Sequence, residues 1–465
     1  MNISGSECNR MNNPVLTAVG VLILVCFHIK AQSKKAADVE SPPLLIAAAS
    51  TLCASSDSLR TDDIELLIAP LEEAELLSGA ILIASGKDIV YESTFGFSNW
   101  ELQVPNTPAT RFGIASITKI MTEALTRFLV KEGRIDLEAP VEQYIPGFPR
   151  GSEGGMPTVG HLLNHRAGVP HRVTDPIDET QPLSAAEIVE RVKKQGLLFE
   201  PGSKRLYSSA GYTCLARVIE IVEKEPFASV LSNRVFLQAG MKSAVDETGQ
   251  NLMLGRALPY RLGTEGDRVV VKNAPYKDLR FLTGAGSVYA SSRDLFRFVQ
   301  SILNDVFGAE LHAELVGENQ ETWISLTGRT SGYEASVDFI PSQRLVFVFL
   351  SNLQSAANWQ LRERIQNLLS GKPVVKIPLP PAVAKVFEEP QSIVGSYGPA
   401  EITIINGQLF RGDSEFYPIE GRRYYIPVSG TIMYFRRDSK GDVEALVSVS
   451  GGGREAVLER SKPAE

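Results

Sequence analysis

Residues 112–119 read FGIASITK, and the residues that follow, IMTEALTRFLV (120–130), repeat apolar side chains at helical spacing. This stripe predicts an amphipathic helix that begins near Ser116 and ends at Gly133. A spacing of three places Ser116 and Lys119 on one face of that helix. A serine at a helix N-terminus lies beside orphan backbone N–H groups and the positive end of the helix dipole. We therefore interpret Ser116 as a candidate nucleophile. Lys119 is expected to stabilise its alkoxide or, with a pKa depressed by burial, to accept its proton.

A second candidate segment, YSS at 207–209, follows a turn expected at 201–202. A phenol close to an ammonium group can have a lowered pKa, so Tyr207 is a candidate general base if it lies near Lys119. The same tyrosine also fits a packed side chain with a satisfied hydroxyl.

A third segment, SLTGRTSGYEASVDFIP at 325–341, reads as strand, turn and strand. A glycine inside a strand lets another backbone or a substrate approach closely, so Thr327 and Gly328 are candidate substrate-binding residues. A backbone N–H here, such as that of Arg329, is expected to form an oxyanion hole with the N–H of Ser116. Taken alone, the segment also fits a plain hairpin.

In this order along the chain, the three motifs resemble those of the serine β-lactamase-like superfamily, in the branch of class C β-lactamases, D-Ala-D-Ala carboxypeptidases and esterases. TVGHLLNHRAGVPH (158–171) and GAGSVYASSRDLFRFVQSIL (284–303) are also similar to that family, and the resemblance spans about 65–369. It implies an α+β fold in which an antiparallel sheet is flanked by helices, with an all-helical subdomain and the site in the cleft between them. It also implies that Ser116 forms an acyl-enzyme and that Tyr207 takes and returns protons.

Two positions depart from the family pattern. Ser209 stands where the family has asparagine, and Leu326 stands where it has lysine or histidine. Loss of a charged partner costs about 1.5–3 kcal/mol. We therefore expect weak or no hydrolysis of β-lactams and D-Ala-D-Ala peptides, whose recognition uses a carboxylate, and better hydrolysis of neutral esters. The alternatives are a catalytically weak or inactive protein that binds a peptide, a cell-wall fragment or a protein partner, and a scaffold protein that acts through its C-terminal part.

Two histidines leave a further alternative open. His161 and His165 permit a Ser-His-Asp triad in principle. In the family that the motifs resemble, the corresponding loop is structural, so a structural role is expected for both.

The composition of the chain limits the kinds of ligand that it is expected to bind. The chain has 465 residues and a net charge of −7, which does not suit a nucleic-acid binder. Its four cysteines contain no C-x-x-C pair and its five histidines show no zinc spacing, so we expect neither a metal nor a cofactor. The expected partner is a small-molecule or peptide substrate. Cys53 and Cys214 are permitted to form a disulfide but equally fit two buried thiols.

The apolar run VLTAVGVLILVCF (15–27) suits a signal peptide better than a membrane span. We expect an exported protein, periplasmic or secreted, with an uncleaved membrane anchor as the alternative. The proline cluster at 371–390 indicates a stiff linker, and the short strands beyond it, with a hairpin turn at Asn406–Gly407, indicate a small β-barrel or half-barrel that resembles a lipocalin-like appendage. We found no helical pattern in this tail. The expected parts are a signal peptide or anchor (1–31), a leader (32–62), a β-lactamase-like serine hydrolase domain (63–370), a linker (371–390) and a small β domain (391–465).

Overall fold

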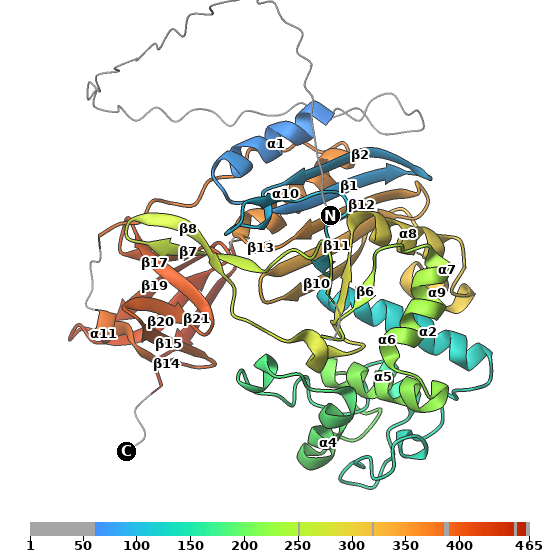
Figure 1. Ribbon diagram of the computed structural model, residues 1–465. Helices are drawn as coiled ribbons and strands as arrows, with labels where there is room; N and C mark the ends of the chain where they lie inside the picture. The colour runs from blue at the N-terminus through green and yellow to red at the C-terminus, as the bar shows by residue number, and fades with distance from the viewer. Residues whose placement is uncertain (1–60, 250–251, 319, 386–389, 451–452, 462–465) are drawn as a thin grey trace, which may run out of the picture. The chain divides into compact units, whose positions relative to one another are not determined.

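The structure is a computed structural model, and it describes residues 61–249, 252–318, 320–385, 390–450 and 453–461. Its central element is a five-stranded antiparallel sheet with the strand order β10-β11-β12-β1-β2 (Figure 1). The first hairpin therefore completes a sheet whose other strands lie more than two hundred residues later. The strands are β1 (Gly79–Ser85), β2 (Asp88–Phe95), β10 (Ile324–Thr330), β11 (Tyr333–Ile340) and β12 (Leu345–Ser351).

Both faces of this sheet are covered by helices, and its inner strands β1, β11 and β12 are almost entirely buried on both sides. In β1, Ile81 and Ile83 belong to the core shared with α1 and α10. Leu82, on the opposite face, belongs to the core shared with α2 and α8. Full burial of each such side chain stabilises the fold by about 1.5–3 kcal/mol. These helices are α1 (Thr61–Glu73), α2 (Thr118–Lys131), α8 (Ser292–Leu303) and α10 (Ala356–Leu369).

Most of the remaining helices form the subdomain between β5 and β6. Helix α4 of this subdomain begins with a capping box, and so does α8, which belongs to the main body. In each box the capping serine, Ser184 or Ser291, accepts a hydrogen bond from the third backbone N–H of its helix. The N-cap of α8 is thus Ser291. Between β5 and β6 lie η1 (Ala115–Ile117), η2 (Val141–Gln143), α3 (Val159–Leu163), η3 (Asp178–Thr180), α4 (Ala185–Gln195), α5 (Ser209–Glu223), α6 (Phe227–Leu231), η4 (Ser232–Phe236) and α7 (Leu237–Ala239). Two further elements, η5 (Leu279–Leu282) and α9 (Ala309–Leu315), follow β6 in the chain.

Short strands connect these parts and hold the loops near the sheet. Strands β5, β9 and β6 form one small sheet, β13, β7 and β8 form another, and β3 pairs with β4. Their bounds are β3 (Phe97–Asn99), β4 (Val104–Pro105), β5 (Phe112–Gly113), β6 (Val245–Asp246), β7 (Tyr260–Glu265), β8 (Arg268–Asn273), β9 (Val288–Ala290) and β13 (Leu353–Gln354).

The C-terminal part is an eight-stranded antiparallel sheet whose strands follow one another in chain order (Figure 1). A β-bridge between Tyr397 and Arg460 brings its two ends together, so the predicted barrel is confirmed as a nearly closed one. The turn at Asn406–Gly407, with φ of 52° and 81°, is the two-residue hairpin that was predicted. The expectation of no helix was wrong by one turn, α11 (Pro390–Ile393). The strands are β14 (Gly395–Tyr397), β15 (Ala400–Ile405), β16 (Gln408–Arg411), β17 (Ser414–Ile419), β18 (Arg423–Ile426), β19 (Thr431–Arg437), β20 (Val443–Val449) and β21 (Glu455–Glu459).

A buried carboxylate joins this barrel to the rest of the chain. Glu415 accepts from the backbone N–H of Thr264 at 2.8 Å and pairs with Lys272 at 3.0 Å. The described part of the proline-rich segment contacts both the predicted hydrolase domain and the barrel. Val374 is buried in the core beneath the sheet, and Pro381 accepts a hydrogen bond from Tyr417 of the barrel at 3.0 Å. These two contacts attach the first half of the segment to the parts of the chain on either side of it.

The predicted signal peptide, the leader up to residue 60 and Cys53 lie outside the described residues. Cys214 is fully buried in α5. Across the part of the chain that the structure describes, none of the helices is both long and apolar enough to cross a membrane.

Candidate active site

Ser116 lies in a tight turn that the surrounding core holds in place. The residue before it, Ala115, has φ of +46°, a left-handed conformation that costs a non-glycine residue about 1–3 kcal/mol. The backbone N–H of Ile114 donates to Val288 at 2.9 Å, which fixes the entry to the turn. Ser116 therefore sits in the 3-10 turn η1, and α2 begins only at Thr118, two residues later than predicted.

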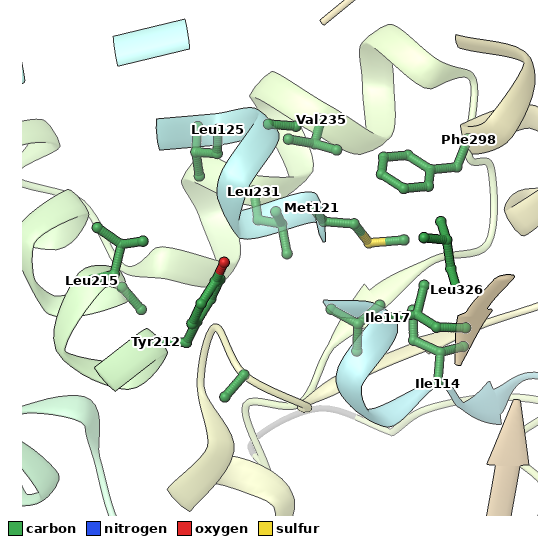
Figure 2. Packing of buried hydrophobic residues seen from close by; sticks show 14 of the residues in the cluster. Ile114, Ile117, Met121, Leu125, Tyr212, Leu215, Leu231, Val235, Phe298 and Leu326 are labelled. Carbon is green, nitrogen blue, oxygen red and sulfur yellow. The ribbon is translucent and has the colours of Figure 1, made fainter. Parts of the chain in front are cut away.

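The turn and the first part of α2 are fastened by apolar side chains. Ile114, Ile117 and Met121 belong to one buried cluster with Leu326 of β10, and Figure 2 shows these four side chains lying close together. Leu326, which stands where a cation was expected, is 8% exposed and completes this packing. An apolar residue at this position therefore stabilises the turn that presents the nucleophile.

Two polar side chains meet at the Ser116 hydroxyl. Tyr207 Oη donates to Ser116 Oγ at 2.8 Å, and Lys119 Nζ lies 3.3 Å from the same oxygen. Lys119 also donates to the carbonyl of Ala285 at 2.7 Å, and its Nζ lies 4.9 Å from the centre of the Tyr207 ring. The hydroxyl at 116, the amine at 119 and the phenol at 207 thus lie in one cluster, as the sequence predicted.

Burial shifts the pKa values of Lys119 and Tyr207 in opposite directions, and only the shift of Lys119 agrees with the sequence-based expectation. Lys119 is almost fully buried, and this desolvation, together with the charge of Arg172, lowers its pKa to about 7. Burial also raises the pKa of Tyr207 above its usual value, an effect that the hydrogen bond to Ser116 only partly opposes. The expectation of a lowered tyrosine pKa was therefore wrong. At neutral pH the phenol remains protonated, and the amine is the group that can accept a proton.

Strand β10 runs directly against the nucleophile turn. A Cβ added to Gly328 would lie 2.1 Å from the carbonyl oxygen of Ile114 and 2.9 Å from the backbone nitrogen of Ser116, so only glycine permits this approach. The Arg329 side chain pairs with Glu334 at 3.0 Å and donates to the carbonyl of Val428 in the barrel at 3.3 Å.

A cavity of about 690 Å³ lies between β10 and the helical subdomain. Six of the seven predicted site residues line it, and the seventh, Lys119, contacts Ser116 from behind. The six are Ser116, Tyr207, Ser209, Thr327, Gly328 and Arg329. A second cavity, of about 410 Å³, adjoins the first and is lined by Lys119 and Leu326 as well as by Ser116 and Tyr207.

The histidines near the site support Tyr207. The His165 ring packs against the Tyr207 ring, tilted by 44° with centroids 4.6 Å apart, and accepts from the backbone N–H of Ser208 at 3.1 Å. Burial and the Lys119 charge lower its pKa to about 4, so it is neutral at physiological pH. His161 forms the capping box of α3 with Thr158. The hydrogen-bond partners of the Ser116 hydroxyl are the tyrosine and the lysine, so the arrangement does not support a Ser-His-Asp triad.

Two further residues of the site were missed by sequence reasoning. His171 accepts from the backbone N–H of Ser209 at 3.4 Å and also accepts through its carbonyl, while Arg172 lines the larger cavity opposite β10. His171 ends the segment 158–171 that was singled out in the sequence without a role for it, whereas no motif included Arg172. Among the described residues, no group of three or more histidine, cysteine or acidic side chains could hold a metal ion.

The fold and these motifs define the class as the serine β-lactamase-like superfamily, which confirms the resemblance. A model of the β-lactamase family matches residues 64–369, and the chain belongs to that family. A penicillin-binding protein of Bacillus subtilis (strain 168) is 25% identical over 449 residues, which cover 85% of this chain and 98% of that protein. The esterase EstB of Burkholderia gladioli is 26% identical over 266 residues, covering 50% of this chain and 67% of EstB.

Among solved structures, a D-amino acid amidase from Ochrobactrum anthropi superposes with a TM-score of 0.58 at 19% identity. The match covers 67% of this chain and 98% of the amidase. At this identity the likeness shows the fold alone. The predicted α+β architecture, with its antiparallel sheet, flanking helices and C-terminal barrel-like sheet, is confirmed.

Proposed function

We propose that the protein is a serine hydrolase that acts through an acyl-enzyme on Ser116. The observation that carries this proposal is the meeting of a buried amine and a phenol at one serine oxygen, at 3.3 and 2.8 Å. Membership of a family that includes penicillin-binding proteins and an esterase supports it.

The first half of the reaction follows from the protonation states. Neutral Lys119 accepts the Ser116 proton while Oγ attacks the substrate carbonyl carbon. The backbone N–H groups of Ser116 and Arg329 hold the resulting oxyanion, which develops where β10 meets the nucleophile turn. When the carbon–leaving-group bond breaks, the Tyr207 phenol donates its proton to the departing atom, and the proton on Lys119 restores the phenol.

Water completes the cycle by the reverse route. It attacks the acyl carbon as the Tyr207–Lys119 pair removes its proton, and the released Ser116 alkoxide regains a proton from the same pair. The acid product then leaves the cavity, and the enzyme returns to its starting protonation state.

Two substitutions bear on the substrate. Leu326 places no charge in the second cavity, and Ser209 offers a short hydroxyl in place of an amide. We propose esters with uncharged leaving groups as better substrates than β-lactams or peptides that end in D-alanine.

The test is covalent labelling. Wild-type protein treated with an aryl fluorophosphonate should gain the mass of one phosphonyl group in an intact-protein spectrum, and peptide mapping should place it on Ser116. Ser116→Ala should stay unlabelled and should hydrolyse 4-nitrophenyl hexanoate no faster than buffer. A folded wild-type protein that neither acquires the adduct nor hydrolyses the ester would instead support a binding protein.

A further inference from the structure

We propose that Arg172 binds a carboxylate on the acyl part of the substrate, across the larger cavity from β10. This inference rests on the proposed function, because it names the substrate class of the same site. It assigns the enzyme to esters of dicarboxylic acids or of other acids whose chain ends in an anionic group.

Arg172 carries more positive charge into the cavity than its partner neutralises. Its guanidinium NH1 contacts Glu179 at 2.9 Å, and the Lys277 amine contacts the other oxygen of the same carboxylate at 2.5 Å. One carboxylate thus serves two cations. The Glu179 side chain is 4% exposed, whereas that of Arg172 is 49% exposed. The guanidinium is therefore anchored at one nitrogen while about half of its side-chain surface is open to a ligand.

The other arginines that line the cavity each have a carboxylate of their own. Arg329 pairs with Glu334 at 3.0 Å. Arg362 donates through Nε to Asp338 at 2.8 Å and contacts it through a second nitrogen. His171, the neighbour of Arg172, has a pKa lowered by burial and by the Arg172 charge, so it adds no positive charge at neutral pH. Of the three arginines that line this cavity, Arg172 is the one whose carboxylate partner also serves a second cation.

The two cavities would hold different parts of the substrate, with the leaving group in the smaller cavity and the acyl chain in the larger one. The leaving group must reach the proton donors, and the smaller cavity contains Lys119 as well as Tyr207. Beside Arg205, its wall includes the carboxylates of Glu123 and Glu314 and the apolar Leu326, which oppose the binding of an anion there. The acyl chain then extends into the larger cavity, where Arg172 lies. The geometry accordingly favours an anionic acyl chain with an uncharged leaving group.

The experiment compares matched esters. 4-Nitrophenyl hydrogen adipate carries a carboxylate at the end of its acyl chain, and 4-nitrophenyl hexanoate is its neutral counterpart. The quantity measured is the ratio of their kcat/KM values. Arg172→Gln should lower this ratio by about 10- to 100-fold, as expected for loss of a charged hydrogen bond. Arg172→Lys should retain part of it, because an ammonium keeps the charge but lacks the planar fork.

The control is Arg150→Gln. Arg150 is 51% exposed and pairs with one carboxylate, Glu142, at 2.9 Å, so it matches Arg172 in exposure and geometry but lies outside the cavities. Its loss should leave the ratio unchanged. Loss of the Arg172 charge also raises the pKa of Lys119 and slows both esters together. The ratio cancels that effect, as it would cancel any general structural damage.

A third ester, 3-carboxy-4-nitrophenyl hexanoate, moves the carboxylate to the leaving group. An adipate ratio that is the same in wild type and Arg172→Gln would overturn the proposal. So would an effect of Arg172→Gln on the third ester larger than that on the adipate, since Arg172 would then serve the leaving group. Failure of the proposed function looks different, because none of the esters would then turn over and Ser116 would remain unlabelled.

Discussion

Replacing Gly328 by alanine tests how closely β10 and the nucleophile turn must fit. The added methyl carbon would stand 2.1 Å from the carbonyl oxygen of Ile114, and real contacts of this kind begin near 3.0 Å. Strand and turn must therefore separate by about 0.9 Å, the difference between these two distances. The same carbon lies 2.9 Å from the Ser116 nitrogen, so the displacement falls on the proposed oxyanion hole. A misplacement of about 1 Å at a reacting centre costs about 100-fold in rate.

The assay measures two rates on Gly328→Ala. These are kcat/KM for 4-nitrophenyl hexanoate and the second-order rate of fluorophosphonate labelling at Ser116. Both should fall by about 100-fold, while thermal unfolding still shows a single cooperative transition, since overpacking costs about 1–3 kcal/mol.

The matched control is Gly155→Ala. This glycine is exposed, and the nearest atom to its added methyl group is the carboxylate end of the Glu200 side chain, at 2.7 Å, which can move aside. Gly155→Ala should keep wild-type rates. A labelling rate for Gly328→Ala within threefold of wild type would refute the reasoning. It would mean that β10 and the nucleophile turn can accommodate the methyl group without displacing Ser116.

Three other outcomes are expected. Because the neutral form of Lys119 is the base and burial lowers its pKa to about 7, kcat/KM for a neutral ester should rise tenfold per pH unit below pH 7 and level off above it; a flat profile from pH 5.5 to 9 would contradict this role. Tyr207→Phe should slow hydrolysis of an alkyl ester by about 100- to 10,000-fold but that of a 4-nitrophenyl ester much less, because nitrophenolate leaves without a proton; equal losses on both would exclude the phenol as the leaving-group acid. Glu415→Ala should reduce the free energy of unfolding by about 3 kcal/mol in urea titrations, because it strips a buried partner from Lys272 and from a backbone N–H; a loss below about 1 kcal/mol would show that the barrel is held by other contacts.

The features of the fold that could be predicted from the sequence are those with a regular local pattern of residues. The stripe of α2 and the turn at Asn406–Gly407 each follow from residues within one short window. Such short segments can be interpreted by themselves, because helical periodicity, strand periodicity and turn formation depend on residues that are close together in the sequence. The pairing of β1 with β12 has no such local cause, since the two strands lie more than 250 residues apart.

By itself, then, the sequence determined which side chains are chemically able to act: a serine and a lysine one turn apart, a phenol and a glycine-containing strand. The tertiary structure alone decided their protonation and their neighbours. It lowered the pKa of Lys119 and raised that of Tyr207, and it placed Arg172 on the wall opposite β10. The physical reason is that desolvation and Coulomb interactions depend on what surrounds a group in space, and here those surroundings come from segments far apart in the chain.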